Sequence, residues 1–175
     1  MRTAIEVGVS GRGIYQDYAL QQVDLKGRVA IPSRLRDTLL ERNVVAGDAR
    51  DASTIVTAIH GSDPCLIGYD IGYAKQLHAE LLERARAHAD ATGAPRSAIM
   101  REAMLSDTMP FDASGRFILP PFPRQELNIG KYAFFIGLGD YFEIWDPATL
   151  IACDTAPQRM KAAVRFFMSE KGEAL

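Results

Sequence analysis

The sequence predicts an α+β fold made of two tandem hairpin-helix-hairpin repeats, with a helical connector between them and a helical tail after the second. Three observations support this prediction. A thirteen-residue stretch occurs twice, at 24–36 and 112–124, and shared positions are 88 residues apart. Runs of β-branched or alternating apolar residues accompany both copies, as in strands. Longer segments, at 71–90 and after 147, show the apolar spacing of helices.

Both copies of the repeated stretch fit the pattern D-x-x-G-R-x-x-x-P-x-x-x-R. The first copy reads DLKGRVAIPSRLR and the second reads DASGRFILPPFPR. Five residues that agree in register over so short a window indicate an internal duplication rather than chance. An internal repeat of this kind sets the architecture before any other feature is considered.

The first repeat is expected to span residues 15–69 and to begin with a hairpin. Apolar and polar residues alternate up to Val23, which predicts its first strand. The Lys26-Gly27 pair predicts a tight turn, because glycine adopts positive φ at little cost. Residues 28–31 are then expected to return as the second strand of the hairpin.

A short helix and a second hairpin are expected to complete this repeat. Pro32 ends the preceding strand, because proline cannot donate to a sheet ladder. Ser33 is the predicted cap of a helix at 34–41. Two apolar runs, at 54–59 and 65–69, surround a cluster of turn residues and predict the second hairpin.

Residues 70–107 are expected to form a helical connector. Asp70 is the predicted cap of a helix over about 71–90, and Gly93 followed by Pro95 is expected to end it. A further short helix is expected after that proline. The connector therefore separates the two repeats in sequence.

The second repeat is expected at 108–146, with its tight turn at 114–115. Prolines at 121 and 123 suit only the first turn of a helix, so we expect a short helix that starts late, at 124–127.

Runs at 131–138 and 141–145 predict the closing hairpin of the second repeat. Asp146-Pro147 is a strong helix start, and the helical tail is expected over 147–175. Residues 1–14 contain three glycines and little periodicity, so we expect a flexible leader there.

The composition limits the possible functions. A chain of 175 residues, 47% hydrophobic, has a core to bury. No apolar run approaches a membrane span, so we expect a cytoplasmic location and no membrane partner. With a net charge of −2 and a pI of about 5.9, the surface as a whole is not expected to be a nucleic-acid footprint.

Basic residues gather in the first copy, where Lys26, Arg28, Arg34 and Arg36 stand against one acid, Asp24. Lys26 and Arg28, braced by Asp24, could bind phosphate and base edges at a hairpin tip. The alternative is a hairpin salt bridge with no ligand. Arg34 and Arg36 could contact phosphate or lie on a solvated helix face.

The second copy offers Arg116 and Arg124 against Asp112. Ser114 stands where the first copy has its lysine. We therefore expect a smaller contribution to binding from this copy.

The remaining chemically distinctive residues predict structure rather than catalysis. Trp145, Phe142 and Phe135 could stack on bases, but alternation along their strands favours the core. The three histidines are not spaced as ligands on one helix, so we expect no metal site. The two cysteines are isolated and typical of buried small residues. No local motif predicts a nucleophile or a cofactor site, so we expect no enzymatic activity and no cofactor.

The duplicated D-x-K-G-R-x-x-I-P-x-x-x-R pattern, followed by G-x-G-x-x-x-E-I-W at 137–145, resembles the MraZ family of the AbrB/SpoVT-like swapped-hairpin superfamily. The resemblance covers about residues 15–145. It implies two tandem AbrB/SpoVT-like repeats that form a small β-barrel-like body, with the connector and tail as further helices.

The resemblance also implies a function. The family consists of bacterial DNA-binding transcriptional regulators that act on the promoter of the division and cell-wall gene cluster through short direct repeats. It implies double-stranded DNA as partner, a ring-like homo-oligomer and a nucleoid-associated location. The family's DNA-contacting segment corresponds here to Asp24, Lys26 and Arg28, and to Asp112 and Arg116.

Two other classes of function remain open. One is an AbrB-like antitoxin or protein-interaction module in which DNA binding is secondary; a captured protein partner without a DNA shift would favour it. The other is an enzyme on a small β-barrel-like body, which would need a polar pocket with perturbed acids.

Overall fold

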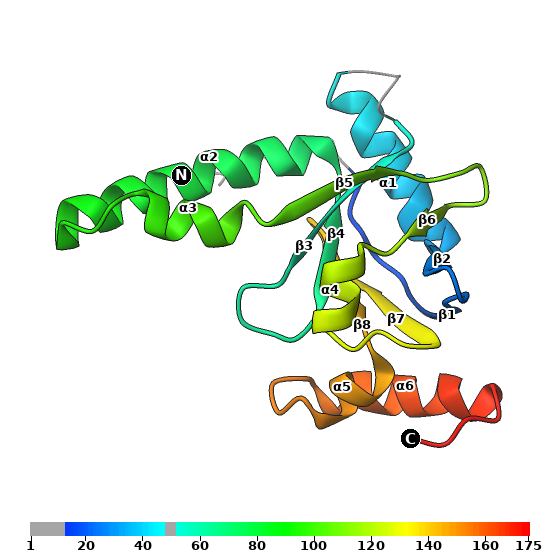
Figure 1. Cartoon of the computed structure of the whole chain (residues 1–175). Coiled ribbons are helices and arrows are strands. Elements are labelled where there is room, and N and C mark those ends of the chain that lie inside the picture. The colour runs from blue at the N-terminus through cyan, green and yellow to red at the C-terminus, as the bar shows by residue number, and fades with distance from the viewer. Residues whose placement is uncertain (1–12, 48–51) are drawn as a thin grey trace, which may run out of the picture.

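A six-stranded sheet and a two-stranded ribbon form the framework of the chain, which is described by a computed structural model over residues 13–47 and 52–175 (Figure 1). The strands are β1 Tyr18–Gln22, β2 Arg28–Ala30, β3 Thr54–Ile59, β4 Leu66–Tyr69, β5 Ser106–Pro110, β6 Arg116–Ile118, β7 Tyr132–Gly137 and β8 Phe142–Trp145. The helices are α1 Ser33–Val45, α2 Ile71–Thr92, α3 Ser97–Ala103, α4 Pro121–Glu126, α5 Pro147–Ala152 and α6 Gln158–Glu170. The predicted α+β class is confirmed. Most of the predicted leader, residues 1–12, lies outside the described residues.

The strand order of the large sheet is symmetric with respect to the two halves of the chain. The order is β1-β7-β8-β4-β3-β5, and the ribbon is β2-β6. If each strand of the first half is exchanged with its counterpart in the second (β1 with β5, β2 with β6, and so on), the arrangement is unchanged. The ribbon register follows the same exchange, because Arg28 is opposite Ile118 and Arg116 is opposite Ala30. The two halves thus occupy equivalent places in one shared sheet.

The strands before and after each glycine turn do not pair with each other as a hairpin. β1 pairs with β7, β5 pairs with β3, and β2 pairs with β6. The expectation that residues 28–31 pair back onto the preceding strand is therefore wrong. A turn sets only the reversal of the chain, whereas burial of the apolar face selects the ladder partner. The closing hairpins, β3–β4 and β7–β8, are confirmed.

Across residues 13–47 and 52–175, the strands do not close into a barrel. β1 and β5 are the two edges of an open sheet. The β-barrel-like body implied by the family resemblance is thus corrected to an open sheet with a separate ribbon over one face.

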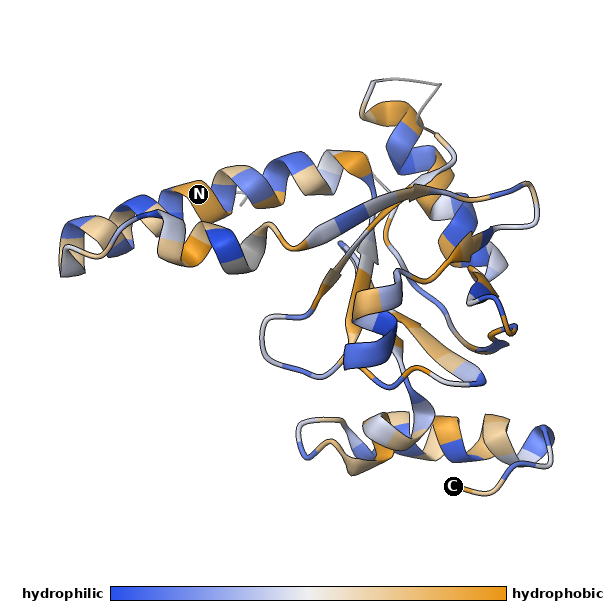
Figure 2. Ribbon diagram, viewed as in Figure 1, coloured by the Kyte–Doolittle hydropathy of each residue, from blue (hydrophilic) through white to orange (hydrophobic). Residues whose placement is uncertain are grey.

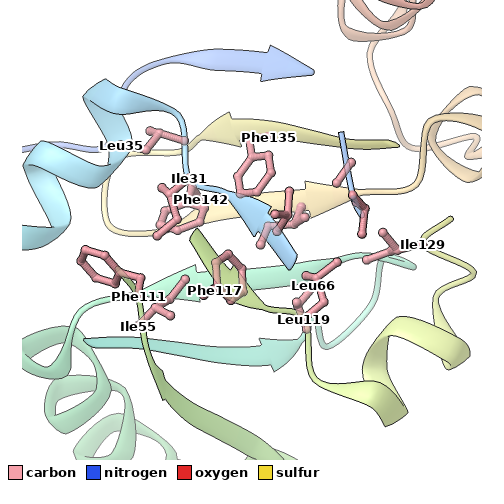
Figure 3. Close-up of a cluster of buried hydrophobic side chains, with 14 of the residues drawn as sticks. Ile31, Leu35, Ile55, Leu66, Phe111, Phe117, Leu119, Ile129, Phe135 and Phe142 are labelled. Carbon is pink, nitrogen blue, oxygen red and sulfur yellow. The ribbon is translucent and has the colours of Figure 1, made fainter. Parts of the chain in front are cut away.

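The main core lies between the ribbon and the sheet. Val29 and Phe117, which face each other in the ribbon, belong to the same buried cluster as Phe135 and Phe142 of the sheet (Figure 3). Leu35 of α1 joins this cluster. Each fully buried apolar side chain contributes roughly 1.5–3 kcal/mol. This burial fixes the inner face of the ribbon and leaves its other face outward.

Helices cover the opposite face of the sheet in two places. Phe134 and Trp145 pack with Val164 of α6, while Val56 and Tyr69 lie in a separate cluster beside α2. Beyond the sheet, α2 and α3 continue as a projecting arm (Figure 1). Figure 2 shows hydrophobic residues concentrated on the strands and many hydrophilic ones on α2. Among the described helices, none combines the length and apolar character needed to cross a membrane.

Two short-range helix predictions are corrected. α1 begins at Ser33 itself, and Pro32 occupies the N-cap without a side-chain hydrogen bond, so the predicted serine cap is wrong. α4 begins at Pro121 rather than at 124–127. Proline suits a first turn because its missing N–H would be unpaired there anyway. Asp70 does cap α2, as predicted.

Candidate nucleic-acid interface

Asp24 organises the turn that leads into β2. Its Oδ1 accepts hydrogen bonds from the main-chain N–H groups of Lys26 (2.8 Å) and Arg28 (2.9 Å), and its Oδ2 accepts one from Arg28 Nε (2.6 Å). Gly27 closes the turn with φ of 81°, a conformation that glycine adopts at little cost. One carboxylate therefore fixes both the backbone of the turn and the direction of the guanidinium group.

The turn that leads into β6 repeats this geometry. Asp112 Oδ1 accepts hydrogen bonds from the main-chain N–H groups of Ser114 and Arg116, and its Oδ2 accepts one from Arg116 Nε. All three distances are 2.9 Å. The side chains of Arg28 and Arg116 are 47% and 54% exposed. Each guanidinium group is thus anchored on one side and open to solvent on the other.

Both aspartates are held in the ionised form. Hydrogen bonds from Arg28, first from its main-chain N–H and then from its guanidinium, lower the pKa of Asp24, and those from Arg116 lower the pKa of Asp112. Exposed ion pairs of this kind add little to folding stability. The charge-assisted hydrogen bonds therefore serve mainly to orient the arginines.

The ribbon brings both arginines to one outward face. Because Arg28 is opposite Ile118 and Arg116 is opposite Ala30, the two arginines are diagonal neighbours, with Cα atoms roughly 7–8 Å apart. Ile118 lies on the same face and is 54% exposed. The ribbon face, defined here as Arg28, Ala30, Arg116 and Ile118, thus combines residues of both copies.

The last arginine of each motif supports the turn of the other copy. A Cβ on Gly27 would lie 2.7 Å from Arg124 Nη1, and one on Gly115 would lie 2.9 Å from Arg36 Cδ. The main-chain N–H of Ile31 likewise donates to the Gly115 carbonyl at 2.9 Å. Each turn is therefore assembled from both halves of the chain.

Seven of the predicted site residues lie on the ribbon, in its turns or against them: Asp24, Lys26, Arg28, Arg36, Asp112, Arg116 and Arg124. Arg34 is the exception, since it is exposed on α1. The equivalent residue of the second copy is the exposed Phe122, so α4 offers no matching charge there.

Two features of this surface are not evident from the sequence. One is the exposed Ile118, which follows Arg116 by two positions, so that strand alternation places both on one face. In sequence the two motifs also look like separate tips, because Val29 and Phe117, which pair in the ribbon, are 88 positions apart and this pairing has no local signal. The core placement of the three aromatic residues considered for stacking is confirmed, since each is at most 2% exposed.

Comparisons with known proteins identify the family of this chain. Residues 104–151 match the family model described as "MraZ protein, putative antitoxin-like", and this span includes the second turn and β6. A protein of Saccharophagus degradans named transcriptional regulator MraZ is 33% identical over 145 residues, covering 79% of this chain and 90% of that protein. One of the same name from Pseudomonas savastanoi pv. phaseolicola is 32% identical, covering 71% and 74%. Another, from Pseudoalteromonas translucida, is 29% identical, covering 72% and 75%. The chain therefore belongs to the MraZ family.

Proposed function

We propose that this chain is a DNA-binding transcriptional regulator, not an enzyme, and that the ribbon face is its DNA-reading surface. The observation that carries the proposal is the pair of half-exposed arginines, each anchored through Nε by an aspartate on one two-stranded ribbon. A two-stranded ribbon fits the major groove of B-DNA. The names of the relatives support the same function.

Arg28 and Arg116 are the proposed base-reading residues. Their Nε atoms are held by aspartates, so the terminal nitrogens remain to donate to the acceptor edge of guanine. Arg36 and Arg124 act through the turns that they contact, and set the direction of the ribbon ends.

Lys26 and Arg34 are the proposed phosphate contacts. Both are exposed, and phosphate contacts position a protein on the duplex without reading sequence. Because Ser114 stands in place of the lysine in the second turn, the first turn contributes more to affinity.

The target and the assembly follow from the family resemblance. The proposed site of action is the promoter of the division and cell-wall gene cluster, at short direct repeats, in the cytoplasm at the nucleoid. We further propose that the two halves are AbrB/SpoVT-like repeats. The strand order supports this proposal, because it is unchanged when each strand is exchanged with its counterpart in the other half. We also propose a ring-like homo-oligomer, which would compensate for the small basic surface of one acidic chain. Several ribbon faces in one ring, opposite repeated DNA sites, raise the effective concentration of each face at its site.

A gel shift and a footprint on the DNA upstream of the protein's own gene test this function. We expect protection of short, evenly spaced repeats, and an affinity that falls steeply with salt because phosphate contacts release counterions. Equal binding to an unrelated fragment of the same length would contradict a sequence-specific regulator.

A second candidate is an antitoxin-like interaction module with secondary DNA binding. The description of the matching family model favours it, and the projecting α2–α3 arm is the surface available for a protein partner. Co-purification of a stoichiometric protein partner, together with no footprint, would support this candidate over the first.

A further inference from the structure

The sheet carries a cavity of about 550 Å³ on the face opposite the ribbon, beside the start of α6. Its walls are largely apolar and include Phe134, Ile136, Trp145, Met160 and Ala163. The charged groups in the described lining are the carboxylates of Asp63 and Glu143 and the exposed guanidinium of Arg159. A cavity of this size and lining accommodates a small organic molecule held by a few polar groups.

Glu143 occupies a position where its neighbours are apolar. It lies opposite Ile67 on one side and Ile136 on the other, and it is only 7% exposed. When the two halves are exchanged, β8 takes the place of β4, and Glu143 takes the place of Ile67. A carboxylate therefore stands where the equivalent strand has an isoleucine.

The Glu143 carboxylate is only half satisfied. Its Oε2 accepts a hydrogen bond from Trp145 Nε1 at 2.7 Å. Its Oε1 accepts none from any residue in the described part of the chain, and it is not fully enclosed, since Thr57 Oγ1 is the buried side-chain polar atom there that lacks a partner. Burial raises the pKa of Glu143, although the indole N–H opposes this shift. The largely buried carboxylate therefore offers a free acceptor oxygen at an apolar cavity, where a ligand could supply a donor.

We propose that this cavity binds an organic ammonium ion that carries an apolar body. The ammonium group donates to Glu143 and Asp63, and the body packs against Phe134, Trp145 and Met160. Asp63 is already oriented, because its Oδ1 accepts the Thr155 hydroxyl at 2.7 Å. This site lies on the other face of the sheet from the ribbon and does not depend on the proposed DNA binding.

A metal ion fits these residues less well. His60, Asp63 and Glu143 do lie with ligand atoms within 4.8 Å of one another, a grouping that histidine spacing alone did not predict. However, His60 Nδ1 accepts the main-chain N–H groups of Ser62 (3.2 Å) and Asp63 (2.9 Å). The proton of the neutral ring is therefore on Nε2, and neither nitrogen offers a free lone pair to a metal.

The single tryptophan of the chain lines this cavity, so its fluorescence reports on the site directly. The experiment titrates the full-length protein with 2-phenylethylammonium, with its neutral isostere 2-phenylethanol, and separately with zinc chloride. We expect a saturable change in Trp145 emission with the ammonium compound, at least about tenfold tighter than with the alcohol, because the charged hydrogen bonds are absent from the alcohol.

Matched variants separate the carboxylate from the cavity. Glu143→Gln should weaken ammonium binding about 10- to 100-fold, whereas Glu126→Gln, an exposed carboxylate on α4 outside the cavity, should leave it unchanged. Ala163→Leu should also weaken binding by filling the space while leaving both carboxylates intact. Melting curves identify any variant that fails to fold.

The proposal is overturned if the alcohol binds as tightly as the ammonium compound. It is also overturned if folded Glu143→Gln retains full affinity, or if zinc alone changes the emission at micromolar concentration. Because none of these readouts involves DNA, a negative result here leaves the proposed regulator function separately testable.

Discussion

Carboxylates in this chain have opposite electrostatic environments according to their neighbours. Asp24 and Asp112 lie in solvent-accessible turns, where main-chain N–H groups and an arginine lower the pKa of each carboxyl group. Glu143 lies in the sheet between isoleucines, where loss of water raises its pKa. Asp24 and Asp112 are therefore charged groups that orient Arg28 and Arg116. The charged form of Glu143, by contrast, lowers the stability of the fold.

The cost of Glu143 predicts a pH-dependent stability difference. Because the pKa is raised in the folded state, the folded chain holds the proton more tightly, and this stabilisation is lost as pH rises through the folded pKa. The Glu143→Gln variant has no carboxyl group at this position, so its stability does not decrease in this way. We expect the free energy of unfolding of wild type, relative to the variant, to decrease from pH 4.5 towards pH 8 in urea titrations. A difference that stays constant with pH would show that Glu143 is not desolvated.

At the scale of the single element, the two glycine turns form a matched pair. Gly27 and Gly115 have φ of 81° and 77°, and an alanine in this region costs roughly 1–2 kcal/mol. The neighbours differ, however. The new Cβ at Gly27 would meet the flexible end of Arg124, whereas at Gly115 it would meet Arg36 Cδ and the Ile31 carbonyl.

We therefore expect Gly115→Ala to destabilise the fold more than Gly27→Ala, with both losing at least about 1 kcal/mol. Urea unfolding of the two variants side by side measures the difference. A larger loss for Gly27→Ala would mean that the contact of Arg124 is the more rigid of the two.

The two helix-capping aspartates form a second matched pair. Asp70 caps α2 and also accepts Arg42 Nε at 2.7 Å, with both side chains at most 2% exposed. Asp146 caps α5 but has no arginine partner among the described residues. Asp70→Ala should cost about 3–5 kcal/mol because it removes the buried carboxylate that pairs with Arg42 and leaves that guanidinium only the longer contact with the exposed Asp140, and Asp146→Ala about 1 kcal/mol. Equal costs in denaturant titrations would show that Arg42 pairs elsewhere, for example with Asp140 at 3.7 Å.

Elements with local signals were predictable from sequence, and those that depend on distant contacts were not. The turns at Gly27 and Gly115, the closing hairpins and the Asp70 cap all have their determinants within a few residues. The pairing of β2 with β6 joins segments 88 residues apart, so no local pattern could predict it. The early start of α4 is not evident from sequence, because two prolines suggest a late start, although a first turn tolerates them.

The candidate site shows the same division. The sequence motif identified Asp24, Arg28 and their counterparts, because the Asp–Arg spacing is local to one turn. It could not predict that Arg36 supports the second turn, since that contact crosses between the halves. The cavity beside Glu143 also escaped prediction, because its lining comes from β1, β7 and β8, the loop between β3 and β4, and the tail around α6.

At the scale of the whole molecule, the two halves share one sheet and one ribbon, so neither half alone contains the whole ribbon face. The chain nevertheless offers only a small basic surface within a net charge of −2. We expect a homo-oligomer larger than a dimer, in which several ribbon faces act together. Light scattering at micromolar concentration measures this directly, and a monomer mass there would contradict the proposed ring.

The most direct test of the central claim, that the ribbon face reads DNA, is titration of the footprinted fragment with wild type, Arg28→Ala and Arg116→Ala at several salt concentrations. Loss of an arginine–base contact costs about 1–3 kcal/mol, so we expect Arg28→Ala to bind at least about tenfold more weakly and Arg116→Ala to lose less. Melting of both variants should change little, by roughly 0.5 kcal/mol or less, because these side chains are exposed. Wild-type affinity in Arg28→Ala, or weak binding that accompanies early melting, would contradict the claim.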